Sequence, residues 1–376
     1  MSQVNNATEA LASRYADIFI SKFQDIDMEN PGSWIRCSSH AQQNLEGKPY
    51  RGMNRLILSM AASDMGYGLP LWMTFNQAKS YGVSVVKGSR SMPVVFYDVF
   101  IRDAETHERV DISVDDFRCM PADERKGLEK IVRTQWYSVF NVDQTNFAEV
   151  YPELINDLRS HFSEENSFYH NCEILDSMVN NQSWDCPIEI IDKSPAYIES
   201  YDKIVIGDKN SFGNDRQWYS VLLHLMAHST GCSERLDRSL GSSDLELYAK
   251  EELVAELGSA ICCGLFGIDA SLSTENLKFL KGWIQTIQED PRYIYNVMRE
   301  ATQASNFISD SLGLSQDKCL DVSSLLKKVD IEENKKVEKE NNRKERSFKV
   351  SSDDGSVKVS RKVTVNKRNN HGRRQF

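Results

Sequence analysis

The sequence lacks a long apolar segment, a secretory signal and a cysteine framework. No stretch of about 18 apolar residues occurs, so we expect no transmembrane helix and no membrane partner. Residues 1–23 have no basic region followed by an apolar one, which argues against a secretory signal. The 8 cysteines show no CxxC spacing, and two of them are adjacent. Such usage is typical of reduced thiols, and we expect a cytoplasmic protein.

Charge is distributed unevenly along the chain. Residues 341–376 contain 11 basic and 3 acidic residues, whereas the whole chain carries −10, so the other 340 residues carry −18. Because an acidic body repels polyanions, any contact with nucleic acid must be local. Residues 330–376 are predicted to be a basic, disordered tail that is either merely solvated or a nucleic-acid contact. Within it, Phe348–Val365 alternates around an Asp-Gly turn and is typical of a hairpin.

Three segments are predicted, and the fold class is α/β in the α+β sense. Residues 1–150 have mixed α/β patterning, and residues 151–315 are mainly helical around one short strand, Lys203–Ile206. Forty per cent hydrophobic residues are enough to build a core in both. Helical periodicity predicts helices at Thr8–Phe23 (with Thr8 as N-cap), Asn54–Met65, Thr74–Tyr81, Trp218–Thr230 and Tyr248–Phe266.

The β-rich runs of the first segment indicate a short hairpin. Val83–Lys87 and Met92–Phe100 are separated by Gly88-Ser89-Arg90, which is typical of a turn. A further strand is predicted at residues 135–142.

Two histidines in the second segment have metal-ligand spacing. His224 and His228 are four residues apart in a predicted helix, so both imidazoles lie on one helix face, as in proteins that bind Zn²⁺. Glu252 and Glu256 have the same spacing on the next helix and could supply a ligand and a carboxylate that orients a histidine. The alternative is that the histidines are packed core residues.

The position after the first histidine lacks an acid. Zinc peptidases carry HExxH because the glutamate moves a proton between the metal-bound water and the leaving amine. Here that position is Leu225, which can transfer no proton. The sequence therefore predicts no catalytic residue at this position.

Residues 34–97 combine aromatic and basic side chains, the two kinds that hold single-stranded nucleic acid. Trp72 and Phe75 are more typical of a core than of a stacking surface, so Tyr50, in a predicted loop beside Arg51, is the better candidate for stacking on a base. Gly52 and Gly88 would let the backbone approach a phosphate.

Both segments resemble ArdC-type antirestriction proteins. The first resembles their N-terminal domain in GKPYRGMN, LPLWMTFNQAKSYGVSVVKGSRSMPVVFYD and QWYSVFNVDQ, and this domain is also similar to TraC-type plasmid primases. The second resembles their metallopeptidase-like domain in LLHLMAHSTGCSERLDR and YAKEELVAELGSAICCGLFGI. The resemblance implies a mixed α/β domain that binds single-stranded DNA, followed by a mainly helical zincin-like domain.

The resemblance also implies functional residues. The metal set would be His224, His228 and Glu252, with Glu256 as the supporting or ligating alternative, and zinc as the cofactor. The chain departs from the family pattern at Leu225 and at Cys232, which replaces a histidine. The DNA-binding set would be Tyr50, Arg51, Asn54, Trp72, Thr74, Gln77, Lys87 and Arg90, and the matching motifs also take in Gly52, Gly88, Pro93, Asn141 and Gln144.

The leading hypothesis is an antirestriction or DNA-transfer accessory protein of a mobile element that binds single-stranded DNA without sequence preference. Its metallopeptidase-like domain would be catalytically impaired, and a host restriction protein is a second candidate partner. One alternative is an active zinc hydrolase that uses Glu251 or Glu256 as its base. Another is a protein-interaction module that binds a peptide along Lys203–Ile206 as an edge strand.

Overall fold

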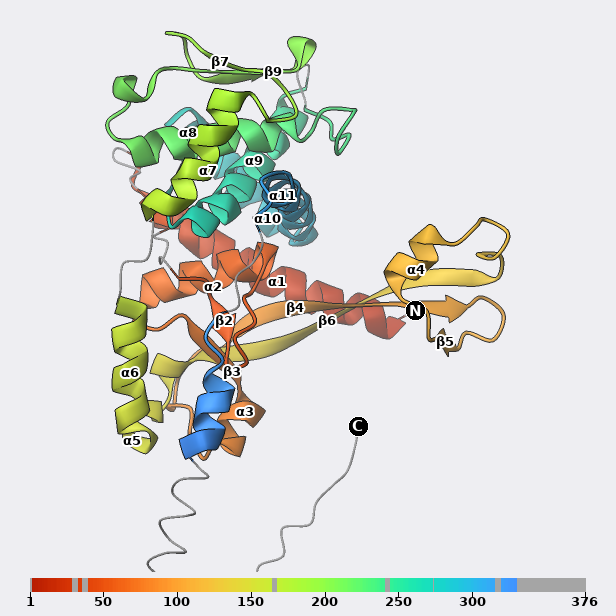
Figure 1. The fold of residues 1–376 in the computed structure, drawn as a ribbon, viewed down its shortest axis with the longest axis vertical. Coiled ribbons are helices and arrows are strands. Elements are labelled where there is room, and N and C mark those ends of the chain that lie inside the picture. Colours follow the sequence, from red (N-terminus) through yellow and green to blue (C-terminus); the bar gives the residue numbers. More distant parts are fainter. Residues whose placement is uncertain are drawn as a thin grey trace, which may run out of the picture. The chain divides into compact units, whose positions relative to one another are not determined.

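The computed structural model describes residues 2–28, 33–35, 40–163, 168–240, 244–272, 274–314 and 319–329. The predicted basic tail and the hairpin at Phe348–Val365 lie outside these residues. The chain divides into two compact units, residues 1–323 and residues 324–376. The following description concerns the first unit (Figure 1).

The first half of this unit is built on a five-stranded sheet with strand order β2-β3-β6-β4-β5. Its elements are α1 (Ser2–Gln24), β1 (Ser33–Ile35), β2 (Gln43–Asn44), α2 (Gly52–Met65), β3 (Leu71–Thr74), α3 (Phe75–Ser80), β4 (Met92–Asp103), β5 (Arg109–Val110), α4 (Val114–Cys119), β6 (Leu128–Asn141), the 3-10 helix η1 (Val142–Gln144), α5 (Phe147–Val150) and α6 (Pro152–Ser163). All contacts in the sheet are antiparallel except that of β2 with β3.

Strands β4 and β6 pair along their whole length, from Met92 opposite Val139 to Asp103 opposite Leu128. They extend beyond β3 as a two-stranded ribbon that carries β5 and α4 at its far end (Figure 1). We call residues 92–103 and 128–141 the β4–β6 ribbon. The predicted hairpin between residues 83–87 and β4 is wrong, because β4 pairs with β6, and Val85 makes only an isolated bridge to Thr145.

The second half of the unit is mainly helical, as predicted, but its sheet is larger than predicted. Its elements are α7 (Phe168–Asn181), β7 (Ile188–Ile190), β8 (Ala196–Ile198), η2 (Glu199–Tyr201), β9 (Lys203–Ile206), η3 (Lys209–Ser211), α8 (Asp215–Ser229), α9 (Leu245–Phe266), β10 (Ala270–Ser271), η4 (Thr274–Phe279), α10 (Leu280–Glu289) and α11 (Arg292–Ser311). Strand β9 lies between β7 and β8. Lys203–Ile206 is therefore a central strand and not the expected edge strand, because both of its flanks are already hydrogen-bonded.

One hydrophobic core joins the two halves. It includes Phe23 and Trp34 from the first half and Trp283 from the second, with the rings of Phe23 and Trp283 6.0 Å apart. Strand β1 pairs with β10, and Arg55 on α2 donates a hydrogen bond to the carbonyl of Gly264 on α9. The first half thus packs directly on the helices that follow residue 244.

The amphipathic pattern of the N-terminal helix is confirmed, but its start is not. Leu11, Tyr15, Phe19 and Phe23 are buried along one face of α1. The helix begins at Ser2, so Thr8 lies inside it and is not its N-cap.

Candidate metal centre and nucleic-acid surface

Helices α8 and α9 position the predicted metal residues. Asn214 caps α8 by accepting a hydrogen bond from the Gln217 backbone, and the helix ends at Ser229, just before Gly231. Asp244 caps α9 in the same way. Because α8 and α9 pack together, their i, i+4 faces meet, and two histidines of α8 lie beside the carboxylates of α9.

His224, His228 and Glu252 bring three ligand atoms together. The two Nε2 atoms are 3.1 Å apart, and Glu252 Oε2 lies 3.6 Å from His224 Nε2 and 3.5 Å from His228 Nε2. Ligands bound at about 2.1 Å in tetrahedral geometry are separated by about 3.4 Å. The spacing of these three atoms therefore fits one divalent ion, and they form a group of converging ligand atoms among the described residues.

The charge around this group also fits a cation. Glu251, Glu252 and Glu256 are each at most 6% exposed, and Arg238 pairs with Glu251. Burial opposes ionisation of Glu252, but the neighbouring imidazoles of His224 and His228 outweigh it and hold its pKa well below the ordinary value. Burial likewise opposes protonation of His228, but Glu251 and Glu252 raise its pKa to about 9. A proton on His228 partly offsets a carboxylate excess that a divalent cation would offset more fully.

Supporting residues hold the ligands from behind. Glu251 Oε1 lies 3.3 Å from His228 Nδ1, and Arg238 donates to both oxygens of Glu251 at 2.7 and 3.0 Å. Asn276 donates from Nδ2 to Glu252 and to Glu256, each at 2.8 Å. Arg238 and Asn276 were not found from the sequence, because they come from a loop and from η4 and no local spacing links them to the helices.

The structure distinguishes Glu252 from Glu256. Glu252 reaches both Nε2 atoms, whereas Glu256 Oε1 lies 3.8 Å from His224 Nδ1. That Nδ1 is buried without a hydrogen-bond partner among the described residues. Glu252 therefore lies beside both Nε2 atoms and Glu256 does not, a difference that the sequence alone had left open.

Leu225 occupies the position of the general base and is 4% exposed, within the hydrophobic core. Cys232, the other departure from the expected pattern, is half-buried and does not belong to the group of converging ligand atoms.

The predicted DNA-binding residues divide into exposed and buried sets. Arg51, Lys87 and Arg90 are exposed. Trp72 is fully buried, and its indole N–H donates to Gln42 Oε1 at 2.6 Å. Tyr50 is 9% exposed and packs in the same cluster as Trp72. Neither ring offers a face to a base in this structure.

Five other residues of the matching motifs have structural roles. Asn54 donates to the carbonyl of Val95 at 2.7 Å and accepts from its N–H at 2.8 Å, which satisfies the outer edge of β4. Thr74 and Gln77 form the capping box of α3. Asn141 and Gln144 form a second capping box at η1, and Gln144 Nε2 donates to the carbonyl of Arg90 at 2.9 Å.

The two glycines of this region differ in what surrounds them. Gly52 has a φ of +51°, and a Cβ there would lie 2.5 Å from Thr302 on α11, so it permits helix packing. Gly88 has a φ of +91°, and a Cβ there would have nothing within 4 Å among the described residues. Of these two glycines, only Gly88 has open space where a side chain would lie.

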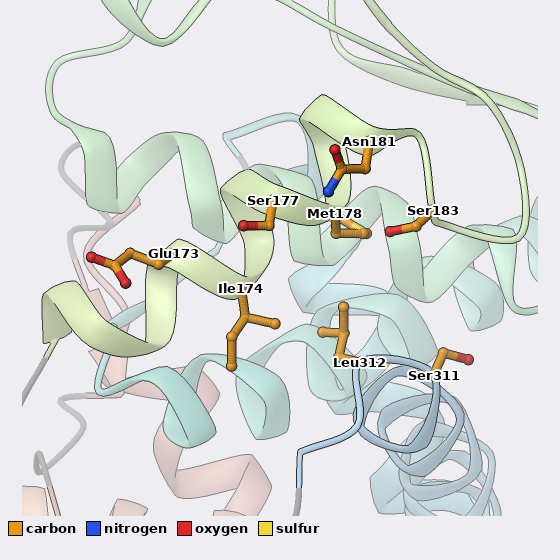
Figure 2. A pocket seen from close by; sticks show the side chains of 8 residues that line it. All are labelled: Glu173, Ile174, Ser177, Met178, Asn181, Ser183, Ser311 and Leu312. Atoms are coloured by element: carbon orange, nitrogen blue, oxygen red, sulfur yellow. The ribbon is translucent and has the colours of Figure 1, made fainter.

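A cavity of about 450 Å³ lies between α7 and the end of α11, apart from the histidine pair (Figure 2). It is lined by Glu173, Ile174, Ser177, Met178, Asn181, Ser183, Ser311 and Leu312. None of the metal-site residues lines it. Among the described residues, no helix is both long and apolar enough to cross a membrane.

Comparison with protein families matches both halves of the chain. The model of the N-terminal domain of anti-restriction factor ArdC matches residues 10–140, and that of a zincin-like metallopeptidase matches residues 174–300. DNA primase TraC of Escherichia coli is 29% identical over 279 residues, which are 74% of this chain and 24% of the primase. The uncharacterized protein y4eC of Sinorhizobium fredii is 26% identical over 309 residues, or 82% of this chain and 89% of that protein.

Solved structures share the fold. The metal-free crystal structure of the antirestriction protein ArdC from plasmid R388 has a TM-score of 0.56 at 24% identity, over 81% of this chain and 99% of that chain. The Mn(II)-bound structure of the same protein has a TM-score of 0.57 at 23% identity, with the same coverage. With an ArdC N-terminal domain followed by a zincin-like domain in one mixed α/β fold, the chain belongs to the ArdC-type family.

Proposed function

We propose that this protein binds single-stranded DNA without sequence preference and serves a mobile element as an antirestriction or DNA-transfer accessory protein. Its zincin-like domain would bind a divalent metal, zinc in the first instance, but would be impaired as a peptidase. A host restriction protein would be the second partner, and the cytoplasm the place of action. The observation that carries the proposal is the ArdC-type N-terminal domain with Arg51, Lys87 and Arg90 exposed on an otherwise acidic chain.

The loop that carries Lys87 and Arg90 supports the DNA-binding part. Its backbone is fixed from within the domain, because Gln144 holds the carbonyl of Arg90 and Val86 N donates to the carbonyl of Gln144. The two basic side chains are therefore presented by a rigid support, and they take no part in holding the loop. Exposed cations of this kind contact phosphates without reading sequence.

Two observations support the loss of peptidase activity. Leu225 can transfer no proton, and Glu251 and Glu256 both approach a histidine at Nδ1. Nδ1 lies on the opposite edge of the imidazole from Nε2, which faces the converging ligand atoms. A carboxylate on the Nδ1 side orients the ring, but it does not reach a water bound beside the Nε2 atoms. Both acids considered as unconventional bases are therefore badly placed for that role.

The metal-binding part rests on the donor set itself. Two imidazoles and a carboxylate suit zinc, and they also suit manganese, which occupies the similar R388 protein in one crystal structure. When bound, the ion would act as a Lewis acid. His224, His228 and Glu252 would hold it, while Glu251, Glu256 and Asn276 would fix their orientation.

The proposal is tested by fluorescence anisotropy with a labelled dT oligomer and the full chain at low and moderate salt. Wild type is expected to bind, with an affinity that falls steeply as salt rises. The double variant Lys87→Ala/Arg90→Ala should bind more weakly and with a shallower salt dependence. The matched control is Lys193→Ala/Lys281→Ala, which removes two exposed lysines from the zincin-like half and should change nothing.

Deletion of residues 330–376 separates the domain from the tail. If the deletion abolishes binding while the Lys87/Arg90 variant retains it, the tail is the binding element and the assignment to the N-terminal domain is wrong. If wild type does not bind at either salt concentration, the DNA-binding proposal itself is wrong.

A further inference from the structure

The β4–β6 ribbon has one face with exposed aromatic rings. Val94 lies opposite Tyr137, and Phe96 lies opposite Gln135. Because directly paired residues point to the same face of a sheet and alternate residues share a face, Phe96 and Tyr137 are diagonal neighbours on one face. Phe96 is 53% exposed and Tyr137 is 41% exposed. We call these two residues the aromatic face.

The exposure of this face is local. Nearer β3, the same face is covered by Leu58 and Ala61 of α2, which pack with Val94 and Val139 in a buried cluster. On the opposite face of the ribbon, the ring of Trp136 is covered by the guanidinium of Arg14 from α1, 5.6 Å from the ring centre. Only the aromatic face is left without a covering helix at this level of the ribbon, among the described residues.

Tyr137 lies beside a buried residue. Burial raises the pKa of the Tyr137 hydroxyl, and the neighbouring Tyr50, which packs in the buried cluster, also affects that pKa. A ring that is partly packed in this way loses less conformational entropy when a flat ligand stacks on it than a freely rotating side chain does.

Charges beside the aromatic face suit a polyanion. Arg133 lies on the same face of β6, two residues beyond Gln135, and is exposed. Arg51, next to Tyr50 in the chain, is exposed at the start of α2. The acid opposite Arg133, Asp98, already has Arg109 3.6 Å away. Another acid near Tyr50 and Tyr137 is Glu46, which accepts a hydrogen bond from Gln77 at 3.0 Å.

We propose that Phe96 and Tyr137 are a stacking platform for two bases of single-stranded DNA, with Arg133 and Arg51 contacting the adjoining phosphates. This inference rests on the proposed function and assigns the base-contacting residues, none of which was among the residues inferred from the sequence. Aromatic side chains on an open sheet surface hold two or three bases of a single strand in other nucleic-acid-binding folds. Stacking needs no hydrogen-bond readout, so binding stays independent of sequence.

The test compares a dT oligomer with an abasic oligomer of equal length, which has the same phosphates but no bases. Full-length wild type should bind the dT oligomer more tightly. Phe96→Ala and Tyr137→Ala should each weaken binding of the dT oligomer by about 5- to 150-fold and leave the abasic oligomer almost unchanged. The salt dependence should stay that of wild type, because no phosphate contact is removed.

Conservative variants and a matched control distinguish stacking from unfolding. Phe96→Trp and Tyr137→Phe keep an aromatic ring and should retain binding. Tyr201→Ala removes a ring that is 75% exposed on the zincin-like half, and it should bind like wild type. Thermal unfolding of the alanine variants should show a cooperative transition like that of wild type, because both residues lie at the surface of the sheet and neither belongs to a buried cluster.

Each other outcome has a definite meaning. If wild type binds no oligomer, the proposed function fails, and this inference fails with it. If wild type binds but the alanine variants bind equally well, or if dT and abasic oligomers bind alike, the stacking platform is wrong and DNA binding stands. If the alanine variants instead abolish self-association seen by sedimentation, the aromatic face is an interface between two copies, which also overturns the inference.

Discussion

His228 is held by a carboxylate at each ring nitrogen. Glu251 lies 3.3 Å from Nδ1, and Glu252 lies 3.5 Å from Nε2. The first contact is fixed by Arg238, so the position of the ring is set before any ion binds. In the proposed metal site, Glu252 would be a ligand and Glu251 would orient His228.

Substitution of these two acids should therefore affect metal binding to different degrees. Glu252→Gln removes a charged ligand and is expected to abolish binding of Zn²⁺ or Mn²⁺ in calorimetric titration. Glu251→Gln should weaken binding by about 10- to 100-fold, as is typical of residues that orient a ligand. Glu300→Gln is the control, because Glu300 pairs with Lys250 and lies outside the group of ligand atoms. Equal metal affinities of the Glu252→Gln, Glu251→Gln and Glu300→Gln variants would show that no metal site exists at these residues.

Leu225 should determine whether the zincin-like domain can hydrolyse a peptide bond. Wild type is expected to show no metal-dependent hydrolysis of a denatured protein substrate such as casein. Leu225→Glu restores a group that can transfer protons, which is worth about 10²–10⁴ in rate, so it should bring hydrolysis that a chelator abolishes. Leu225→Gln has a similar volume without the acid and should stay inactive. Chelator-sensitive hydrolysis by wild type would contradict the proposed impairment.

The ion pair between Asp202 and Arg235 should make the stability of the protein depend on pH. Hydrogen bonding to Arg235 holds the pKa of Asp202 below its ordinary value of 3.8, although partial burial opposes this. A lowered pKa in the folded state stabilises the protein above pH 3.8, and this contribution is lost as the pH falls below that value. Asp202→Asn should therefore be destabilised at pH 7 by about 1–3 kcal/mol, because it leaves the largely buried Arg235 without its carboxylate. The difference in unfolding free energy between variant and wild type should shrink below pH 3.8, and a constant difference would count against this ion pair.

At the scale of elements, the side chain of Asn54 hydrogen-bonds α2 to the backbone of β4. Asn54 satisfies both backbone polar groups of Val95, where β4 has no strand on its outer side because β5 pairs only at Ile101 and Arg102. Asn54→Ala should lower the unfolding free energy by about 1–3 kcal/mol, because the N–H and carbonyl of Val95 both lose their partner. Asn76→Ala, at an exposed position of α3, is the control for denaturant unfolding. An Asn54→Ala variant that is as stable as wild type but binds DNA weakly would instead give Asn54 a role in binding.

Sequence patterns predicted the features that depend on neighbouring residues. The i, i+4 spacings pointed to both histidines and Glu252, whose ligand atoms do lie together, and periodicity found helices α2, α8 and α9 to within a few residues of their ends. The features that the sequence did not predict depend on contacts between residues far apart in the chain. The partner of β4 begins 25 residues after β4 ends, and the residues that support the metal ligands come from separate segments.

The same reason explains why the exposure of aromatic residues could not be predicted from the sequence. Trp72 and Tyr50 pack with Leu58 and Ala61 of α2 in a buried cluster, whereas Phe96 and Tyr137 are exposed. Which aromatic rings are covered depends on how α2 packs on the sheet, and no local sequence pattern indicates that.

At the scale of the whole chain, the two matched domains share one core. The sequence predicts a boundary near residue 150, but Phe23 and Trp34 of the first domain pack in the same core as Trp283 of the second. Strands β1 and β10 also pair across that boundary. Each domain therefore completes the hydrophobic core of the other.

This shared core predicts how fragments of the chain will behave. Residues 1–150 expressed alone would expose the apolar faces of α1 and α2, and we expect this fragment to aggregate or to unfold without cooperativity. Residues 1–323 should unfold in one cooperative transition, because they form one compact unit. Thermal unfolding monitored by circular dichroism, together with gel filtration, distinguishes these outcomes. A monomeric 1–150 fragment with a sharp transition would show that the first domain is independent. If the fragment instead fails to fold alone, a mutation that loosens α1 should disturb DNA binding and metal binding together, because both proposed sites depend on the same core.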